Sequence, residues 1–181
     1  EKSIYQLTTF CLSALEILEA SPKYELKFLS NFNSKESIYE YLNDKGCLAG
    51  VPGSGNYAMA IAIFLTYKQK ITKSQKYTNL IQYWFDLHDK AQNPKTGFWG
   101  KKIRERHYWG FQNALHQFLI YHYHNKPIGY PIKIANRIIS MQDHNGFFSM
   151  YPGGGGCWDF DAAHILISLD INDDNVNTRI M

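Results

Sequence analysis

The sequence lacks the motifs that mark the common enzyme classes. No GxSxG, HExxH or HRD motif is present, which leaves serine hydrolases, zinc proteases and kinases without support. The three cysteines, Cys11, Cys47 and Cys157, are odd in number and widely spaced, so they predict neither a disulfide framework nor a CxxC metal knuckle. This use of cysteine favours a reducing compartment, and we therefore expect a cytoplasmic protein.

Long apolar runs and strong charge are also missing. The longest apolar run, Ala58–Leu65, is too short to cross a bilayer, and no signal segment opens the chain. The net charge is only +3, and the densest basic cluster, Lys101–Arg106, accompanies no nucleic-acid-binding motif. We therefore expect no membrane span and no nucleic-acid partner. A chain that begins at Glu1 and stops at Met181 in a polar tail is expected to be a piece of something longer.

What the sequence does contain is apolar and aromatic. Hydrophobic residues make up 45% of the 181 residues and charged residues 19%, which is typical of a globular protein with a real core. Thirteen Tyr, eleven Phe and four Trp give an aromatic share of 15%, which suits either a core or a lined cavity. We expect a single domain over residues 1–181.

Three turn segments of similar sequence recur along the chain. They begin at Asn43, Asn93 and Asp143, a constant spacing of fifty residues. Each opens with Asn or Asp, places a Gly where a turn needs a positive φ angle, and continues with bulky apolar residues. Such a period is typical of repeat architectures, and we expect each repeat to contain helix, turn, loop and helix. The expected repeats lie near residues 35–70, 75–125 and 130–170.

The two helices predicted in each repeat differ in character. The helix before each turn has one apolar face, whereas the helix after it is apolar nearly all round, as in Ala58–Leu65. This difference predicts an all-α fold in which inner helices are covered by outer helices. The expected outer helices are Lys35–Leu42, Gln75–Ala91 and Pro131–Met141. The expected inner helices are Asn56–Lys68, Tyr108–His124 and Trp158–Leu169.

Two further segments precede this pattern. Ser3–Ala20 carries an apolar stripe at helical spacing and is expected to be another outer or leading helix. The stripe consists of Leu7, Phe10, Cys11, Ala14, Leu15 and Leu18. Tyr24–Phe32 is expected to be extended, although it has no evident partner strand.

Two of the turns carry a resemblance to a known family. The segments Gln92–Trp99 and Gln142–Phe148 resemble the Gln…Gly-x-Trp turns that terpenoid cyclases and protein prenyltransferase β subunits carry between helix pairs. The resemblance covers roughly residues 35–170 and implies an α/α toroid. A closed toroid of these families has about twice the helices predicted here, so the chain would be an open half, a truncated piece or half of a dimer.

The resemblance extends to one acidic motif. Asp159-Phe160-Asp161-Ala162 resembles the DxDD motif of class II terpene cyclases, with Ala162 in place of the last Asp. It implies that Asp161 is a proton donor and Asp159 its supporting partner, chemistry that needs a protonated carboxylic acid in a dry pocket. The structural alternative is that both acids lie in the first turn of a helix, where they satisfy free amides and complement the dipole.

The same segment suggests a metal site. On a helix, Asp161 and His164 share a face, and Cys157 lies one turn earlier. With Cys157 and His164 as metal ligands and Asp159 or Asp161 as a third, the site would suit zinc and leave one position open for substrate. The alternative is a small buried cysteine filling space beside a core histidine with satisfied hydrogen bonds.

The glycines before this helix are a candidate ligand site. Gly153–Gly156 leads into the helix start, where backbone amides hold phosphates such as a prenyl diphosphate. We name Gly155, Gly156 and Trp158 as candidate ligand-binding residues. No P-loop or dinucleotide fingerprint accompanies the glycines, and a flexible loop is the alternative.

Histidine and aromatic residues are dense in the segment His107–His124. Trp109, His116 and Tyr123 are expected to line a cavity, because polar residues on an otherwise apolar inner helix need partners or a wet pocket. We name Trp109 and His116 as candidate ligand-binding residues. Aromatic wall packing is the alternative.

Three functional hypotheses follow. The first is a terpenoid-cyclase or prenyltransferase-like pocket for a hydrophobic or diphosphate-bearing small molecule, with Asp161 as acid. The second is a non-catalytic helical-repeat module with an exposed apolar flank, completed by a homodimer partner or a missing segment. The third is a carbohydrate-active toroid whose ligand is a glycan, with Glu105 and Asp159 as an acid/base pair.

Overall fold

The fold is built from helices, which confirms the expected all-α class. The computed structural model describes residues 2–99, 107–148, 156–169 and 171, with the backbone alone for residue 2 and residues 107–113. In these ranges every regular element is helical, and one isolated bridge joins Gln92 and Trp99. The helices are α1 (Lys2–Ile17), η1 (Lys27–Asn31), α2 (Lys35–Asp44), α3 (Gly55–Thr72), α4 (Gln75–Ala91), α5 (His107–Tyr123), α6 (Pro131–Ile139) and α7 (Cys157–Ser168).

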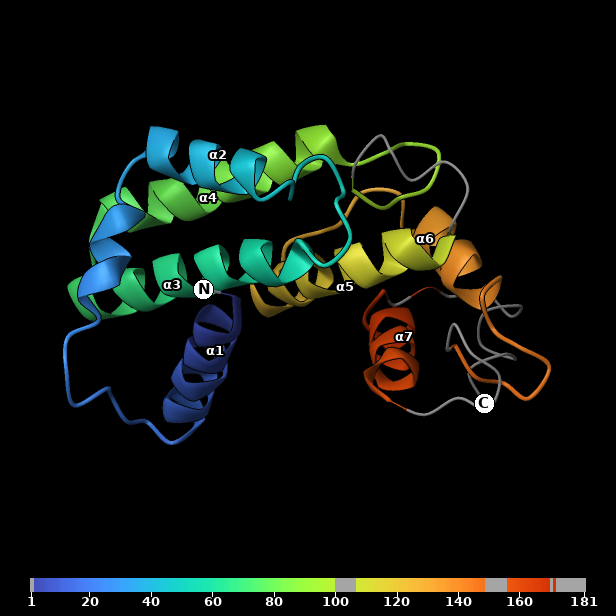
Figure 1. Cartoon of the computed structure of the whole chain (residues 1–181), viewed down its shortest axis with the longest axis horizontal. Coiled ribbons are helices and arrows are strands. Elements are labelled where there is room, and N and C mark those ends of the chain that lie inside the picture. The colour runs from blue at the N-terminus through green and yellow to red at the C-terminus, as the bar shows by residue number, and fades with distance from the viewer. Residues whose placement is uncertain (1, 100–106, 149–155, 170, 172–181) are drawn as a thin grey trace.

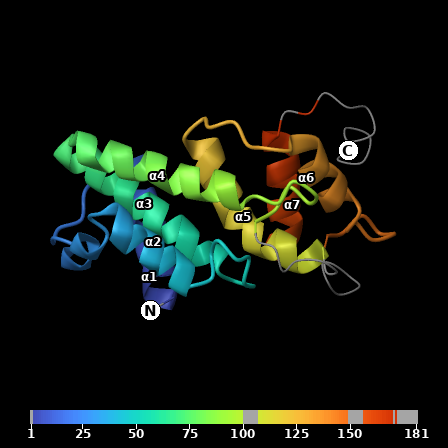
Figure 2. The ribbon, with the colours of Figure 1, turned by 90° about the horizontal axis from the view of Figure 1, so that it is seen from above.

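Helix α1 contacts α3, α3 contacts α5, and α5 contacts α7. In Figure 1, α3 and α5 run across the middle of the molecule, with α2 and α4 above them and α1 and α7 below. Helices α2 and α4 contact each other and cover α3, while α6 contacts α5 and α7 (Figures 1 and 2). Helices α2 to α7 begin and end within a few residues of the bounds predicted from the three repeats.

Helix α3 is at the centre of the molecule because its sequence is apolar on most sides. It contacts α1, α2, α4 and α5. Its buried side chains include Met59, Ile61, Phe64 and Leu65, each at most 4% exposed. By contrast, α4 buries one face, as expected for an amphipathic helix that covers one side of a core. The buried residues of α4 are Leu80, Ile81, Trp84, Phe85 and His88.

Helix α1 buries a different face from the one predicted. Thr9 and Leu12 are buried, and Tyr5 stacks on Phe28 of η1 with ring centroids 5.4 Å apart. Most of the predicted stripe is exposed: Leu7, Phe10, Cys11, Ala14 and Leu18. The prediction failed because α1 has apolar side chains on two faces, and its contact with α3 and η1 covers only one.

The segment expected to be extended is also different. Residues Lys27–Asn31 form a short 3-10 helix, and Leu29 and Phe32 insert into the core with 2% and 3% of their surface exposed. The period of three in this helix places both side chains on the side that faces α1 and α3.

The turn that begins at Gln92 is fixed by backbone and side-chain hydrogen bonds. The Asn93 N–H donates to Phe98 O at 2.7 Å, and the Gly97 N–H donates to Asn93 O at 2.8 Å. The side-chain amide of Gln92 donates to Gly97 O and to Gly129 O, both at 2.8 Å. Gln92 therefore satisfies carbonyls of two segments that are far apart in the sequence.

The turn fifty residues later is closed by similar hydrogen bonds, although it has one residue fewer between the Asp and the Gly. The Asp143 N–H donates to Phe147 O at 2.8 Å, and the Gln142 side chain donates to Gly146 O at 3.1 Å. Both turns share a Gln, an Asn or Asp and a Gly-aromatic pair, and these residues close the turn between an outer and an inner helix.

An aromatic cluster joins the turn at Gln92–Trp99 to the core. The Trp84 indole donates to Ala58 O on α3 at 3.0 Å, and the Trp99 indole donates to His88 O at 2.8 Å. The Tyr121 hydroxyl donates to Asp89 Oδ1 at 2.5 Å. Helix α4 is therefore hydrogen-bonded to α3, α5 and the turn at once.

His88 is a buried neutral group in this cluster. It is 0% exposed, stacks on Trp84 and places Nδ1 2.8 Å from Trp84 O. Burial lowers the pKa of His88 to about 4, and the hydrogen bond to Trp84 O offsets this only in part. At neutral pH the ring is uncharged, so it packs as an aromatic side chain.

A matched pair of glycine substitutions tests the two turns. Gly97 has a φ of +77°, and a Cβ there would lie 2.5 Å from Ile134 Cγ1 in the core. At Gly146, where φ is +90°, a Cβ would make only an ordinary contact, 3.8 Å from Gln142 Nε2. Both Ala variants carry backbone strain of about 1 kcal/mol, and Gly97→Ala adds an overpacking cost of about 1–3 kcal/mol. Denaturant unfolding should show the larger loss for Gly97→Ala, and equal losses would contradict the packing described.

The buried neutral His88 predicts a loss of stability in acid. Its folded pKa of about 4 lies below the ordinary 6.5, so protons bind the unfolded chain more tightly. Its contribution is complete above pH 6.5 and falls by about 3 kcal/mol as the pH drops to 4. His88→Gln should therefore show a smaller pH dependence of the unfolding free energy than the wild type. The control, His144→Gln at an exposed site, should keep the wild-type dependence; identical curves for both variants would contradict a neutral buried His88.

Candidate functional site

A cavity of about 720 Å³ lies between α1, α3 and α5, with α7 at its edge. Its lining surface is mainly apolar, and it takes residues from the sides of α1, α3 and α5 that face one another. Among the lining residues are Leu12, Met59, Ile63, Ile71, Leu119 and Ile120. The apolar character of the inner helices therefore serves both the core and the wall of this cavity.

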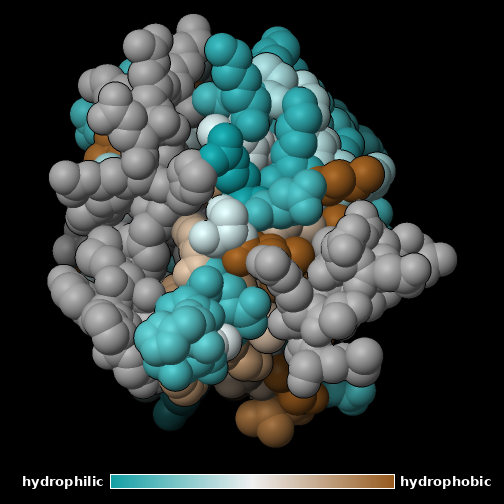
Figure 3. Space-filling view, turned by 90° about the vertical axis from the view of Figure 1, so that its right-hand side faces the viewer, coloured by the Kyte–Doolittle hydropathy of each residue, from teal (hydrophilic) through white to brown (hydrophobic). Residues whose placement is uncertain are grey.

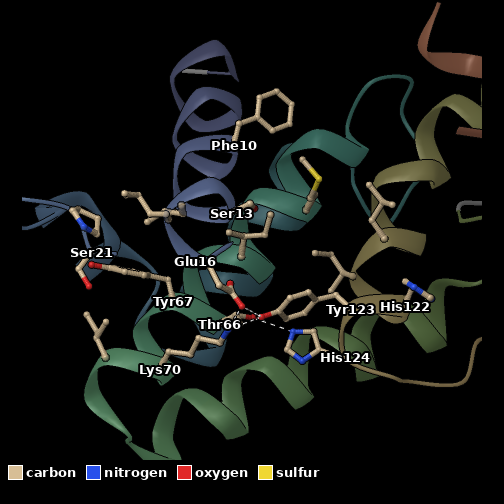
Figure 4. A pocket seen from close by; sticks show the side chains of 18 of the residues that line it. Phe10, Ser13, Glu16, Ser21, Thr66, Tyr67, Lys70, His122, Tyr123 and His124 are labelled. Atoms are coloured by element: carbon tan, nitrogen blue, oxygen red, sulfur yellow. Dashed lines mark hydrogen bonds and ion pairs between the residues drawn. The ribbon is translucent and has the colours of Figure 1, made fainter. Parts of the chain in front are cut away.

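One end of the cavity is polar (Figure 4). The Lys70 ammonium, on α3, forms an ion pair with Glu16 of α1 and donates to the Tyr123 hydroxyl of α5 at 2.7 Å. The Tyr123 hydroxyl donates to Glu16 Oε1 at 2.6 Å. We call these three residues the Glu16–Lys70–Tyr123 cluster. It joins three helices that are not neighbours in the sequence.

A second hydrogen bond lies beside this cluster. The Thr66 hydroxyl donates to Ala62 O at 2.8 Å and lies 3.0 Å from His124 Nε2. Because the single hydroxyl hydrogen is used on Ala62, His124 Nε2 carries the hydrogen and donates to Thr66. Burial and the Lys70 charge lower the pKa of His124, so its ring is neutral at pH 7.

The charges of the cluster balance. Partial burial opposes ionisation of Glu16, but hydrogen bonds from Lys70 and Tyr123 outweigh it and hold the pKa of that carboxyl below its ordinary value. Burial likewise opposes the charge on Lys70, and its bonds to Glu16 and Tyr123 raise its pKa. At neutral pH the cavity end therefore contains one carboxylate and one ammonium with no net charge.

His164, a predicted metal ligand, lies at the α7 edge of the cavity. Its ring is 5.6 Å from that of His122 on α5 and 5.9 Å from that of Phe160. Burial and the nearby His122 lower the pKa of His164. Phe160 and Ile167 of α7 are 70% and 68% exposed, and apolar surface is visible at this end of the molecule (Figure 3).

Asp161, the predicted acid, is 9% exposed. It lies on the side of α7 that also buries Ala162 and Ile165, so it does not line the cavity between α1, α3 and α5. Burial raises the pKa of Asp161 to about 6. The carboxyl therefore has the environment expected of an acid, but the fold separates it from the cavity described.

Asp159 has a structural contact. It lies in the first turn of α7, and its Oδ1 accepts a hydrogen bond from the Phe148 N–H at 2.6 Å. This bond ties the second Gln-Asp turn to the start of α7. Asp159 thus lies at a helix start, as the structural alternative predicted, but the amide that it satisfies belongs to the preceding turn.

The predicted zinc ligands are not brought together. In the part of the chain that the structure describes, no three His, Cys, Asp or Glu side chains are grouped so that they could hold a metal ion. Cys157 is exposed, whereas Asp161 is buried against the core and His164 faces the cavity. These side chains are of types that bind zinc, but on α7 they point in different directions and do not form a common site.

The remaining predicted ligand-binding residues that the structure describes lie at the start of α7 and in the middle of α5. Gly156 is the residue before α7 and has a φ of +117°, and Trp158 is half-buried against the core. His116 is half-buried on α5. Gly155, the side chain of Trp109, Glu105 and the basic segment Lys101–Arg106 lie outside the described residues.

The most polar part of the cavity was only partly foreseen. Tyr123, which was expected to line a cavity, does so. Glu16 and Lys70 were not singled out, because they lie 107 and 53 residues from Tyr123 and nothing in the local sequence connects them. Only the packing of α1, α3 and α5 brings the three together.

In the described residues no helix is long and apolar enough to cross a membrane, as expected.

Comparisons of the chain with models of protein families, with curated proteins and with solved structures gave no match. What the chain does must therefore be inferred from its own residues.

Proposed function

We propose that this chain binds a small hydrophobic molecule of isoprenoid type in the cavity between α1, α3 and α5. The observation that carries the proposal is a volume of about 720 Å³ with a mainly apolar lining surface. This volume lies in the range of about 300–1,000 Å³ that is common for small-molecule sites. A few polar groups gathered at one end of an apolar cavity are the usual means of orienting such a ligand.

The charges of the cavity favour a neutral ligand over a diphosphate. Of the described residues that line it, Lys70 is the only Lys or Arg, and its charge is already paired with Glu16. A diphosphate is normally held by several Lys, Arg or metal charges, since removing it from water is costly. The apolar part of the expected ligand therefore has better support than the diphosphate part.

A second candidate function is acid catalysis by Asp161. The supporting observation is that burial raises its pKa to about 6, so that about a tenth of the carboxyl is still protonated at pH 7. Asp161 lies one helical turn before His164, which borders the cavity. In this hypothesis the acid acts on a substrate that reaches the buried side of α7.

Filling the cavity should abolish binding. The probe is N-phenyl-1-naphthylamine, whose fluorescence rises in apolar sites and falls when farnesol displaces it. Ile63, on the cavity wall, is replaced by Trp, and the control is Ile132→Trp at an exposed site on α6. We expect Ile63→Trp to weaken binding of probe and farnesol about tenfold or more, because the added ring occupies the ligand volume. The control should bind as the wild type does.

Two results would contradict the proposal. If the wild type bound neither probe nor farnesol, the cavity would not be a ligand site. If Ile63→Trp and Ile132→Trp bound equally well while both remained folded by circular dichroism, the ligand would be bound elsewhere.

Asp161→Asn tests whether the buried carboxylate lowers the free energy of unfolding. Its folded pKa of about 6 exceeds the ordinary 3.8, so burial of the carboxylate destabilises the folded chain at pH 7, and this penalty disappears below pH 4. Asp161→Asn should therefore raise the unfolding free energy at pH 7 and leave it nearly unchanged at pH 3.5. A functional residue often shows such a conflict with stability. A loss of stability at pH 7 would mean that the carboxylate has a stabilising partner instead.

A further inference from the structure

The Glu16–Lys70–Tyr123 cluster has hydrogen-bonding capacity left for a ligand. Lys70 uses one N–H on Glu16 and one on Tyr123, and the Tyr123 hydroxyl uses its hydrogen on the same Glu16 oxygen. An ammonium has three N–H groups and a carboxylate two oxygens. Within the described part of the chain, no residue engages the third N–H of Lys70 or the second oxygen of Glu16. The cluster thus has one donor and one acceptor left for a ligand.

Both groups are reachable from the cavity. Glu16, Lys70 and Tyr123 all line it, and the side chains of Glu16 and Lys70 are each 43% exposed. Figure 4 shows the three side chains converging from separate helices at one end of the space. Their mutual bonds fix the positions of the ammonium and the carboxylate before a ligand arrives, which reduces the entropy lost on binding.

The balance of charge selects the kind of polar group. An anion such as a phosphate would meet the Glu16 carboxylate as closely as the Lys70 ammonium, and it would exchange full hydration for one N–H. A hydroxyl accepts from Lys70 through its oxygen and donates its hydrogen to Glu16, so it satisfies both groups and introduces no charge.

We propose that the Glu16–Lys70–Tyr123 cluster binds the hydroxyl group of a neutral isoprenoid or long-chain alcohol whose hydrocarbon part fills the apolar cavity. This inference rests on the proposed function, because it assigns the polar end of the same ligand. Thr66 and His124 lie beside the cluster and contribute a hydrogen bond between themselves, which keeps the neutral imidazole in one orientation.

The test compares three ligands that share a hydrocarbon chain. Farnesol, farnesene and farnesyl diphosphate are each used to displace N-phenyl-1-naphthylamine from the wild-type chain. We expect farnesol to bind about tenfold more tightly than farnesene, since a hydrogen bond to a charged group contributes at least that much, and the diphosphate to bind no better than farnesol. Equal binding of farnesol and farnesene, or tightest binding of the diphosphate, would overturn the assignment.

Variants of the cluster test whether it causes the preference for farnesol over farnesene. The double variant Glu16→Leu/Lys70→Met removes both charges and their hydrogen-bonding groups together, so that neither charge is left unpaired. Tyr123→Phe removes only the bridging hydroxyl. The double variant should bind farnesol and farnesene equally, Tyr123→Phe should reduce the preference, and Tyr39→Phe, at an exposed site on α2, should retain it. A preference that survives in the double variant would place the hydroxyl elsewhere.

The outcomes separate this inference from the proposed function. If all three ligands bind without preference for the alcohol, the cavity is still a ligand site, but the cluster does not bind the hydroxyl group. If no ligand displaces the probe, both the proposed function and this inference are contradicted.

Discussion

The central constraint on this structure is that α3 is apolar on most sides and must be covered on all of them. Helices α1, α2, α4 and α5 all contact it. The aromatic cluster of Trp84, His88, Trp99 and Tyr121 then fixes α4, α5 and the turn between them relative to α3 by hydrogen bonds and ring contacts. Because α1 and α5 approach α3 from two sides, the space left between their side chains becomes the cavity.

The sequence predicted those parts of the fold that depend on local patterns. The helices α2 to α7 follow from apolar periodicity, and both Gln-Asp/Asn turns are closed by bonds within a few residues, as at Gln92 and Gln142. The face of α1 was predicted wrongly, because two apolar stripes compete and only packing against Phe28 and α3 decides between them. Residues 24–32 were likewise decided by burial of Leu29 rather than by local propensity.

The site was harder to predict than the fold. The acids Asp159 and Asp161 were predicted to be functional because they begin an inner helix. In the structure, Asp159 accepts a hydrogen bond from the Phe148 N–H of the preceding turn, and Asp161 faces the core. The polar end of the cavity comes instead from Glu16, Lys70 and Tyr123, which stand on three helices and share no motif. Contacts between residues so far apart in the sequence are set by tertiary packing, and a single sequence contains no local signal for them.

Methyl NMR during titration with farnesol tests the central claim most directly, because it reports where a ligand lies in the intact chain. The account predicts that the methyl signals of Met59, Ile63 and Leu119, which line the cavity, shift together and saturate. Those of Ile132, exposed on α6, should stay in place. Shifts confined to α6 and the exposed side of α7, or no shifts at all, would contradict a ligand site between α1, α3 and α5.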